Sequence, residues 1–350
     1  MARKKRLFGK IILSVFIIGV IIAAISGYKV YKMIYGNNVA LQGHEIDFLY
    51  IPTGSEIDDV TKILYKKGCI INKGDFEWVA EQKNYQNHVH PGKYEIKNGM
   101  SNNELVDLLR SGNQTPVHIT FNNIRTIDQL AGAVAKVIEA DSASISDMLH
   151  DKTVLKENGF NENTVLGMFI PNTYEFFWNT TAKGFVNRMK KEYDKFWNKT
   201  RLNKAKQIKL TQNEVVSLAS IIEMETKKDD EKPRVAGVYM NRINKGMKLQ
   251  ADPTVIYAIG DFSIRRVLKT HLDFDSPYNT YKYSGLPPGP ISMPSIASID
   301  AVLNYEKHKY LFFCAKEDFS GYHNFAVTLR EHNLNAKRYQ KQLNKRKILN

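Results

Sequence analysis

Cysteine is scarce in this sequence. The 350 residues contain only Cys69 and Cys314, with no C-x-x-C spacing. Two thiols so far apart provide neither a disulfide framework nor a thiolate metal site. We expect both in the core as small apolar residues, although pairing outside the cell stays open. The sequence also lacks a phosphate-binding glycine loop and a ligand cluster at metal spacing, so no metal or organic cofactor is implied.

Signatures of nucleic-acid recognition are absent as well. No zinc-finger spacing, helix-turn-helix pattern or RNA-binding aromatic motif accompanies the formal net charge of +14. The cationic residues are dispersed, which favours a generally solvated surface over nucleic-acid binding. The positive balance also suits anionic wall polymers or lipid head groups. With 43% hydrophobic and 25% charged residues, the chain is typical of globular protein and long enough for two or three units.

The N-terminus contains the one long apolar run. Residues 11–28 carry no charge, which is about the minimum length for a membrane-spanning helix. We therefore predict a cytoplasmic basic tail (1–10), a transmembrane helix (11–28) and a tether (29–43). The positive flank stays in the cytoplasm, so the rest of the chain lies outside the cytoplasmic (inner) membrane, on its periplasmic side. A cleaved signal peptide, with its small residues at 24–26, is the alternative.

Residues 44–113 alternate between strand and helix patterns. A strand ending in a Pro-Thr-Gly turn, two helices, a strand at 92–97 and a helix stopped by Gly112 are predicted in that order. This order resembles the LysM-like subdomain of some cell-wall enzymes, which implies binding of chains that contain N-acetylglucosamine. A unit that only spaces the remainder from the membrane is the alternative.

Residues 114–205 are predicted to connect this unit to the C-terminal domain. The segment 119–138 repeats the earlier pattern of strand, turn and capped helix, with Thr126 and Gln129 at capping-box spacing. An aromatic-rich strand and turn (167–178) and an amphipathic helix (183–197) follow.

The stretch SLASIIEMET belongs to a predicted helix with a clear start. Thr211 and Glu214 form a capping box. Apolar residues from Val215 to Ile222 fill one stripe, and Glu223 and Glu225 fall on its opposite shoulders. A carboxylate at the core border is costly unless it is paired or neutral, and desolvation raises its pKa toward the range of a general acid. Pairing with downstream lysines or Arg234 is the structural alternative.

Several further elements follow this helix. A second helix begins at Pro233, and a third is predicted at 249–260, with Asp252 as its N-cap. Residues 278–295 form a rigid Pro/Gly loop. A hairpin and a C-terminal helix are predicted in 310–333. The elements together indicate an α+β fold.

Four blocks in this order, SLASIIEMET, VYMNRINKGMKLQADPTVIYAIG, YNTYKYSGLPPGPI and HNFAVTLREHN, resemble the MltG-type (YceG-like) endolytic murein transglycosylases. The anchor, the LysM-like unit and FIPNTYEF fit the same family. The resemblance implies a mixed α+β catalytic domain at 206–350. The sequence departs from the family at Met224 and at SMPS (292–295).

The resemblance also implies site residues. The essential acid is the second glutamate of the E-x-E-T pair, Glu225. The residues expected to bind substrate are Glu223, Gln250, Asp252, Asn279, Thr280, Tyr281 and His323.

The implied reaction needs a single acid. Glu225 protonates the oxygen between N-acetylmuramic acid (MurNAc) and N-acetylglucosamine (GlcNAc), and then deprotonates the muramyl C6 hydroxyl, which closes a 1,6-anhydro ring. The implied partners are glycan strands, the membrane, and wall-synthesis and division proteins. Two alternatives stay open: a hydrolytic muramidase using Glu225 with Asp252, and a non-catalytic anchored scaffold that binds glycan.

Overall fold

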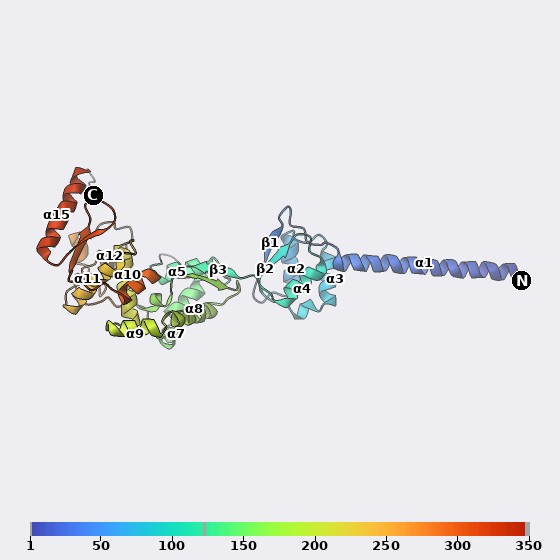
Figure 1. Ribbon diagram of the computed structural model, residues 1–350. Coiled ribbons are helices and arrows are strands. Elements are labelled where there is room, and N and C mark those ends of the chain that lie inside the picture. The colour runs from blue at the N-terminus through green and yellow to red at the C-terminus, as the bar shows by residue number, and fades with distance from the viewer. Residues whose placement is uncertain (1, 122–123, 347–350) are drawn as a thin grey trace. The chain divides into compact units, whose positions relative to one another are not determined.

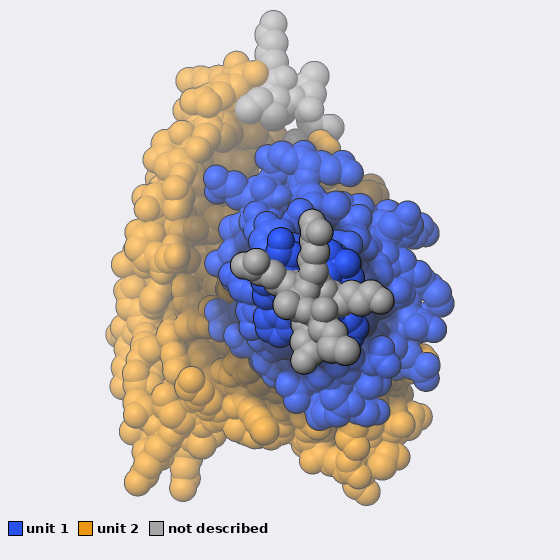
Figure 2. Space-filling model, turned by 90° about the vertical axis from the view of Figure 1, so that its right-hand side faces the viewer, with its two compact units in different colours: residues 1–117, 175–180 blue, residues 118–174, 181–350 orange. Residues whose placement is uncertain are grey.

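The structure, a computed structural model, describes residues 2–121 and 124–346 (Figure 1). Two compact units emerge, coloured separately in Figure 2. Unit 1 comprises Met1–Val117 with Glu175–Thr180, and unit 2 comprises His118–Tyr174 with Thr181–Asn350. The segment that the sequence suggested as a connection, 114–205, therefore belongs for the most part to the same unit as the C-terminal region.

Helix α1 (Ala2–Tyr35) is longer than the predicted transmembrane span. It contains the one helix segment of membrane-spanning length and hydropathy in the described residues, Leu7–Tyr35. At its C-terminal end Met33 and Ile34 pack against the core of unit 1. The Asn102 side-chain amide also donates to the Met33 carbonyl at 2.9 Å. The helix thus continues into unit 1 without an intervening flexible segment.

The expected tether is not a free linker. Asn37 and Val39 form isolated β-bridges with Ser101 and Ile70. Val39 and Leu41 are 2% and 5% exposed, as part of the hydrophobic core of unit 1. The prediction of a tether at 29–43 is therefore corrected: a segment without regular pattern was read as flexible, whereas its apolar side chains are buried by tertiary packing.

The remainder of unit 1 has the predicted strand and helix order. The elements are β1 (Ile46–Ile51), α2 (Ile57–Lys66), α3 (Lys73–Gln82), the 3-10 turn η1 (Tyr85–Asn87), β2 (Gly92–Lys97) and α4 (Asn102–Ser111). β1 and β2 pair antiparallel, from Ile46 opposite Lys97 to Ile51 opposite Gly92. Alternate residues of the strands, such as Leu49, Ile51, Tyr94 and Ile96, are buried, because side chains on a strand alternate between the two faces.

The next part of the chain is mainly helical. It contains β3 (Val117–Thr120), α5 (Ile127–Ala135), α6 (Ser142–His150), α7 (Lys152–Glu157), η2 (Val165–Met168), β4 (Thr173–Phe176), α8 (Ala182–Phe196) and α9 (Lys199–Gln207). β3 pairs with β4. Thr126 caps α5 by accepting from the Gln129 N–H at 3.2 Å, as predicted.

The C-terminal part of unit 2 contains α10 (Gln212–Glu225), α11 (Lys232–Asn244), α12 (Asp252–Ile259), α13 (Lys269–Leu272), α14 (Ile296–Leu303), β5 (Phe312–Ala315), β6 (His323–Ala326) and α15 (Leu329–Lys345). The buried helix α10 packs against α11, α12 and α14, and α15 covers the β5–β6 hairpin (Figure 1). The predicted hairpin and C-terminal helix are confirmed, with His323 opposite Ala315. The overall class is mixed α+β, as expected.

Candidate active site

Helix α10 carries the candidate acid at its C-terminal end. The capping box at its start is confirmed: the Thr211 N–H donates to Glu214 at 2.7 Å, and the Glu214 N–H donates to the Thr211 hydroxyl at 3.3 Å. Every residue from Val215 to Ile222 is buried. The helix is thereby held rigidly, and its last residue, Glu225, has a fixed position.

Glu225 faces a cavity of about 330 Å³. The side chain is half-buried, and its Oε1 accepts a hydrogen bond from the Tyr239 hydroxyl at 2.7 Å. Burial raises the pKa of Glu225 to about 7; the Tyr239 hydrogen bond opposes this rise, the charge of Asp252 adds to it, and Arg242 opposes it. Near neutral pH the carboxyl group is therefore poised between its acid and base forms.

The cavity is lined by polar and aromatic side chains from α10, α11, α12, the 278–295 loop, β5 and α15. The lining residues are Glu225, Tyr239, Arg242, Gln250, Asp252, Tyr281, Phe312, Phe313, Leu329 and His332. Such a mixture of a few polar groups and flat apolar faces suits a sugar ring, which has hydroxyl edges and an apolar face.

Three of the expected site residues line this cavity. Gln250, Asp252 and Tyr281 meet there although 29 residues separate the last two. The Tyr281 hydroxyl donates to Asp252 Oδ1 at 2.5 Å. The prediction that Asp252 is the N-cap of α12 is wrong. Ala251 occupies the N-cap position, and Asp252 is the first helical residue. Its carboxylate is therefore directed to Tyr281 rather than to the helix backbone.

Gln250 has a left-handed backbone conformation, with φ of 50°. Non-glycine residues adopt this region at a cost, and they do so where the surrounding structure holds them. Here the Gln250 N–H donates to the Thr280 carbonyl at 3.1 Å. The strained backbone leaves the Gln250 side chain at the cavity.

Asn279 and Thr280 do not reach the cavity, and the prediction that they contact substrate is corrected. They are 0% and 2% exposed. The Asn279 amide donates to the Leu272 and Phe274 carbonyls at 2.9 and 2.8 Å, and its oxygen accepts from the Tyr281 N–H at 3.0 Å. The Thr280 hydroxyl accepts from the Ala251 N–H at 3.0 Å. Both residues hold the backbone that positions Gln250 and Tyr281.

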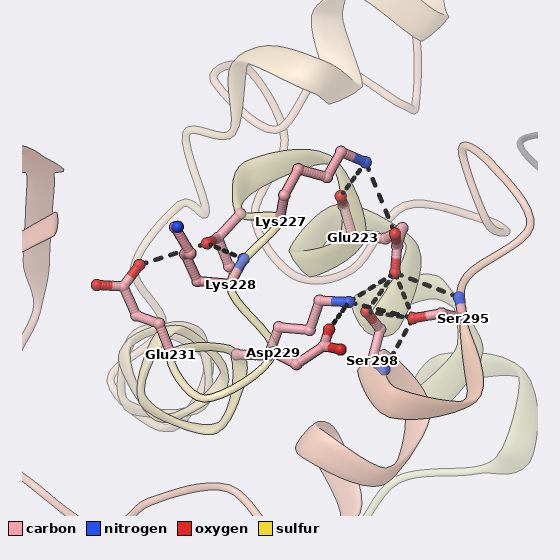
Figure 3. A network of polar contacts seen from close by, with 9 residues as sticks. Glu223, Lys227, Lys228, Asp229, Glu231, Ser295 and Ser298 are labelled. Carbon is pink, nitrogen blue, oxygen red and sulfur yellow. Dashed lines mark hydrogen bonds and ion pairs between the residues drawn. The ribbon is translucent and has the colours of Figure 1, made fainter. Parts of the chain in front are cut away.

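Glu223 also lies away from the Glu225 cavity, as its opposite shoulder of the helix implies. Figure 3 shows its carboxylate beside Ser295 and Ser298, whose hydroxyls donate to Oε2 at 2.5 and 2.6 Å. The buried Lys232 ammonium donates to the same oxygen at 3.0 Å. Burial alone would raise the pKa of Glu223, but these hydrogen bonds outweigh burial and lower it to about 2. Glu223 is therefore not part of the Glu225 cavity: its carboxylate ties α10 to α11 and α14, and its contact with substrate stays a prediction.

His323 is likewise held by an internal partner. Its Nδ1 lies 2.7 Å from Glu231 Oε2, and its backbone N–H donates to Glu231 Oε1 at 2.8 Å. The ring packs edge-on against Phe313, with centroids 5.3 Å apart. His323 is absent from the cavity lining, so its expected contact with substrate is corrected to a supporting role beneath Phe313.

The sequence reasoning missed Tyr239 and Arg242. Both lie on α11, three residues apart and thus on one face of the helix. Arg242 is 7% exposed and donates to the carbonyls of Leu249 and Leu311. A charged residue within an otherwise buried helical face was the available signal, since buried arginine requires partners.

His332, Leu329 and the Phe312–Phe313 pair were missed as well. The ring of His332 stacks on Phe312 at 5.5 Å, and its buried Nδ1 has no hydrogen-bond partner within residues 2–121 and 124–346. Burial, aided by the charge of Arg242, lowers the pKa of His332, so the imidazole stays neutral near pH 7. Leu329 and His332 lie one turn apart at the start of α15, a spacing visible in the sequence.

Within residues 2–121 and 124–346, no group of three or more His, Cys, Asp or Glu side chains is placed to hold a metal ion. Neither cysteine forms a disulfide: Cys69 is buried and Cys314 half-buried, and burial raises the pKa of both thiols.

The chain belongs to the YceG-like family, whose model matches residues 49–338. A relative from Bacillus subtilis (strain 168), named endolytic murein transglycosylase, is 31% identical over 83% of this chain and 83% of its own length. A protein of the same name from Streptococcus pneumoniae serotype 2 is 27% identical over 86% of this chain, which spans 60% of that relative.

A solved structure is also similar. The crystal structure of a YceG-like protein from Listeria monocytogenes superposes with a TM-score of 0.56 at 30% identity, covering 83% of this chain and 98% of the other. The family and the fold therefore rest on sequence and structure together.

Proposed function

We propose that this protein is a membrane-anchored endolytic peptidoglycan lytic transglycosylase that cleaves the MurNAc–GlcNAc bond within nascent glycan strands. The observation that carries the proposal is the half-buried Glu225 carboxyl in a cavity of about 330 Å³, with its pKa raised to about 7. Membership of the YceG-like family and two relatives named endolytic murein transglycosylase support it.

Glu225 acts first as a general acid. Its proton passes to the glycosidic oxygen, the bond to C1 of MurNAc breaks, and GlcNAc leaves with a hydroxyl group. Positive charge develops at C1 and the ring oxygen as the bond breaks. The newly formed Glu225 carboxylate is stabilised by the Tyr239 hydroxyl at 2.7 Å and by the charge of Arg242.

The same group then acts as a base. Glu225 takes the proton of the muramyl C6 hydroxyl, the C6 oxygen attacks C1, and a 1,6-anhydro ring closes. The carboxyl group is protonated again, so the cycle consumes no water and needs no second acid. A pKa near 7 suits both steps, because both the protonated and the ionised form of the Glu225 carboxyl group are readily reached at neutral pH.

The other cavity residues hold the sugars. Gln250 and Tyr281 present an amide and a phenol to hydroxyl and acetamido groups, and the Tyr281 hydroxyl is oriented by Asp252 at 2.5 Å. Asn279 and Thr280 act through these two residues as positioning residues.

Analysis of the reaction products tests the proposal. Mass spectrometry of glycan fragments made by the full chain is expected to give 1,6-anhydro-MurNAc ends. Glu225→Gln, which cannot supply the proton, is expected to lower the cleavage rate about a thousandfold. A Glu225→Gln variant that cleaves at the wild-type rate would refute the assignment of the acid.

Hydrolysis is the second candidate function, because Asp252 lines the same cavity as Glu225. A muramidase uses two carboxylates and releases reducing MurNAc ends. Asp252→Asn distinguishes the two functions. Under the transglycosylase proposal this variant keeps forming anhydro ends, whereas loss of cleavage together with reducing ends in the wild type would favour hydrolysis.

We also propose that α1 is a single-pass anchor in the cytoplasmic membrane, with the basic N-terminus inside and both units outside. The cationic residues 3–6 and Lys10 precede the apolar segment, which supports this orientation. Protease added to intact spheroplasts is expected to digest both units and spare the N-terminus. Protection of the units would reverse the orientation.

The proposed setting places the enzyme beside emerging strands, where internal cleavage terminates elongation and where wall-synthesis and division proteins are its partners. The strand and helix order of unit 1 supports the LysM-like assignment, and with it glycan holding. Binding of chitooligosaccharides to the Glu225→Gln chain, which retains unit 1, tests that role. If unit 1 only spaces the protein from the membrane, no binding is measured beyond that of the catalytic cavity.

A further inference from the structure

Besides the Glu225 cavity, two further cavities border α10, on the shoulder opposite Glu225. One cavity, of about 450 Å³, is lined by Arg125, Gln129, Glu223, Met224, Lys227, Phe262, Ser292 and Met293. The other, of about 190 Å³, shares Arg125, Met224 and Phe262 with the first and adds the apolar residues Pro253, Ile256, Tyr257, Ile264 and Ile291. They form one compound pocket, here called the Arg125 pocket, which no step of the proposed reaction uses.

The pocket contains two cationic groups, Arg125 and Lys227, and the Lys227 ammonium already donates to the Glu223 carbonyl at 3.1 Å. The guanidinium of Arg125 lies over the ring of Phe262, 4.7 Å from its centroid, and among the described residues it has no ion-pair partner. Lys227 is 71% exposed, and its ammonium group lies 3.6 Å from Glu223. Arginine stacked on an aromatic ring keeps its planar donors free to bind a carboxylate at two points.

One carboxylate also lines the pocket, and its charge is already balanced. Glu223 accepts hydrogen bonds from Ser295 and Ser298 and pairs with the buried Lys232 at 3.0 Å (Figure 3). The lining therefore keeps a net positive character that suits a singly charged anion. A doubly charged phosphate is less suited, because the Glu223 carboxylate faces the same space.

The walls of the pocket are rigid and contain an unsatisfied polar group. The Met293 N–H donates to the Ile124 carbonyl at 2.8 Å, and the Ile291 N–H donates to the Ser220 hydroxyl at 3.0 Å. Ser292, between them, is 3% exposed, and its hydroxyl finds no hydrogen-bond partner among the residues that the structure describes. An unpaired buried hydroxyl carries a cost that a polar ligand group would remove.

The pocket lies close to the reaction along the chain. Met224, which lines both of its cavities, is flanked by Glu223 and Glu225, and Pro253 follows Asp252 of the catalytic cavity. The Arg125 pocket and the catalytic cavity therefore adjoin the same ends of α10 and α12.

From this geometry we propose that the Arg125 pocket binds the short peptide that branches from MurNAc, with Arg125 and Lys227 holding a peptide carboxylate and the Met224, Phe262 and Met293 side chains covering its apolar part. The proposal rests on the function proposed above and adds a specificity site: strands that carry peptides are bound better than bare strands. Carboxylate, amide and small apolar groups together match the cationic, polar and apolar parts of the lining.

Direct binding tests the proposal apart from catalysis. Titration calorimetry of the full chain in detergent compares a synthetic stem peptide bearing free carboxylates with the same peptide amidated at every carboxylate. The acid is expected to bind about tenfold more tightly, the usual scale for a charge-assisted hydrogen-bonded pair. Arg125→Ala is expected to remove this preference, and Lys227→Ala to reduce it about twofold.

The matched control is Arg110→Ala, which removes one positive charge from the exposed face of α4 in unit 1. This variant is expected to bind both peptides like the wild type. Arg125→Lys guards against misfolding, because it keeps the charge, and it is expected to retain part of the preference. Equal binding of acid and amide by the wild type would overturn the proposal. A loss of preference in Arg110→Ala equal to that in Arg125→Ala would also overturn it. Displacement of the peptide by inorganic phosphate, at a phosphate concentration below the Kd of the peptide, would overturn it as well.

Cleavage assays separate this proposal from the proposed function. Arg125→Ala is expected to lower kcat/KM about tenfold on peptide-bearing strands and to leave it unchanged on strands stripped of peptide. If anhydro ends form and kcat/KM does not depend on whether the strands carry peptide, the Arg125 proposal alone is refuted. Peptide binding by a protein that makes no anhydro ends would instead sink the proposed function.

Discussion

At the scale of single residues, two glutamates two positions apart have opposite electrostatic roles. The pKa of Glu223 is lowered to about 2 and that of Glu225 is raised to about 7. Burial raises the pKa of both carboxyl groups, so the difference between the two pKa values comes from their partners. Glu223 receives four hydrogen-bond donors, one of them cationic, whereas Glu225 receives the Tyr239 hydroxyl. The structure thus keeps one carboxylate permanently ionised and the other titratable.

The pH dependence of cleavage follows from this arrangement. Glu225 must be protonated to donate, so kcat/KM is expected to fall as pH rises above about 7. The Tyr239 hydroxyl stabilises the carboxylate and thereby lowers the pKa of Glu225. In Tyr239→Phe this pKa rises, and the alkaline fall in kcat/KM moves upward by about one pH unit.

A pH–rate profile of both proteins measures the shift. Tyr322→Phe is the control, because its hydroxyl contacts Asp230, 3.2 Å away, and not Glu225. The alkaline limb of the control is expected to match the wild type. A downward movement in Tyr239→Phe would contradict the assigned direction of the hydrogen bond's effect.

Periodicity predicted that both glutamates border the core, but it could not rank them. The choice of Glu225 came from the family resemblance. The resemblance implies that Asn279 and Thr280 bind substrate, and the sequence of a Pro/Gly loop does not indicate which of its polar residues are buried. Their burial is a tertiary effect: both satisfy backbone groups of segments distant in sequence. Tyr239 and Arg242 were missed because a helical pattern does not say which cavity its buried face meets.

At the scale of elements, Glu223 is the junction of three helices. It belongs to α10, and its carboxylate is bonded to Lys232 of α11, to Ser298 of α14 and to Ser295, the N-cap of α14. Lys232 is 3% exposed, so removal of Glu223 leaves a buried ammonium whose remaining partners are the exposed Asp229 carboxylate and the Ser295 hydroxyl. The helix carrying Glu225 depends on this junction for its position.

Glu223→Gln is therefore expected to destabilise unit 2 by about 3 kcal/mol, as is typical when one partner of a buried pair is removed. The folded-state pKa lies below the unfolded one, so this stabilisation is present above about pH 4.5 and is lost as pH falls toward 2. Thermal unfolding between pH 2 and 7 measures both effects, and the variant is expected to show a shallower dependence on pH.

Lys227→Ala provides the comparison for Glu223→Gln. Lys227 pairs with the same carboxylate, but its side chain is 71% exposed, so its replacement is expected to change stability by less than about 1 kcal/mol. Equal losses in the two variants would contradict the view that burial of Lys232 makes this junction important.

A close approach fixes α11 against the chain that follows α14. A Cβ added to Gly237 would lie 2.3 Å from the Glu306 carbonyl oxygen and 2.5 Å from His308 Nε2. Gly237→Ala is expected to cost about 1–3 kcal/mol and to reduce kcat, because α11 also carries Tyr239 and Arg242. Calorimetry and cleavage assays measure the two effects, and Gly132→Ala, with open space around its Cβ, is expected to lose neither.

Helix starts, the β5–β6 hairpin and the order of elements in unit 1 were predictable because they depend on neighbouring residues. The capping box at Thr211 and the N-cap hydrogen bond of Thr126 are examples, since the residues that form them are three positions apart. The polar stretch 198–207 is different. Its polar composition suggests a connection between helices, yet it forms α9, capped by Asn198 and tied to α14 by the Arg201–Asp300 ion pair at 3.1 Å. That contact joins residues too far apart for local pattern to reveal.

At the scale of the whole molecule, the boundary between anchor and unit 1 decides which truncated chains fold. A chain beginning at residue 29 keeps the segment that bridges Ser101 and Ile70, and is expected to move from the membrane to the soluble fraction with unit 1 intact. A chain beginning at residue 40 lacks Asn38 and Val39, which are 4% and 2% exposed. Unit 1 is then expected to lose about 2–4 kcal/mol of stability.

Fractionation, thermal unfolding and limited proteolysis compare the two truncated chains. Both are expected to retain cleavage of soluble glycan, because the catalytic cavity lies wholly in unit 2. Equal protease resistance of unit 1 in the two chains would show that residues 37–39 contribute little to its core.

The direct packing of the C-terminal end of α1 against the core of unit 1 has a mechanical consequence. Because α1 runs directly onto α3 and α4, through Met33, Ile34 and the Asn102 amide, unit 1 cannot pivot independently of the helix that leads into it. With α1 embedded in a bilayer, any change in the tilt of this helix would reorient the rest of unit 1 by the same angle. Local bilayer thickness, which sets that tilt, would then become a control on how far unit 1 reaches from the lipid surface.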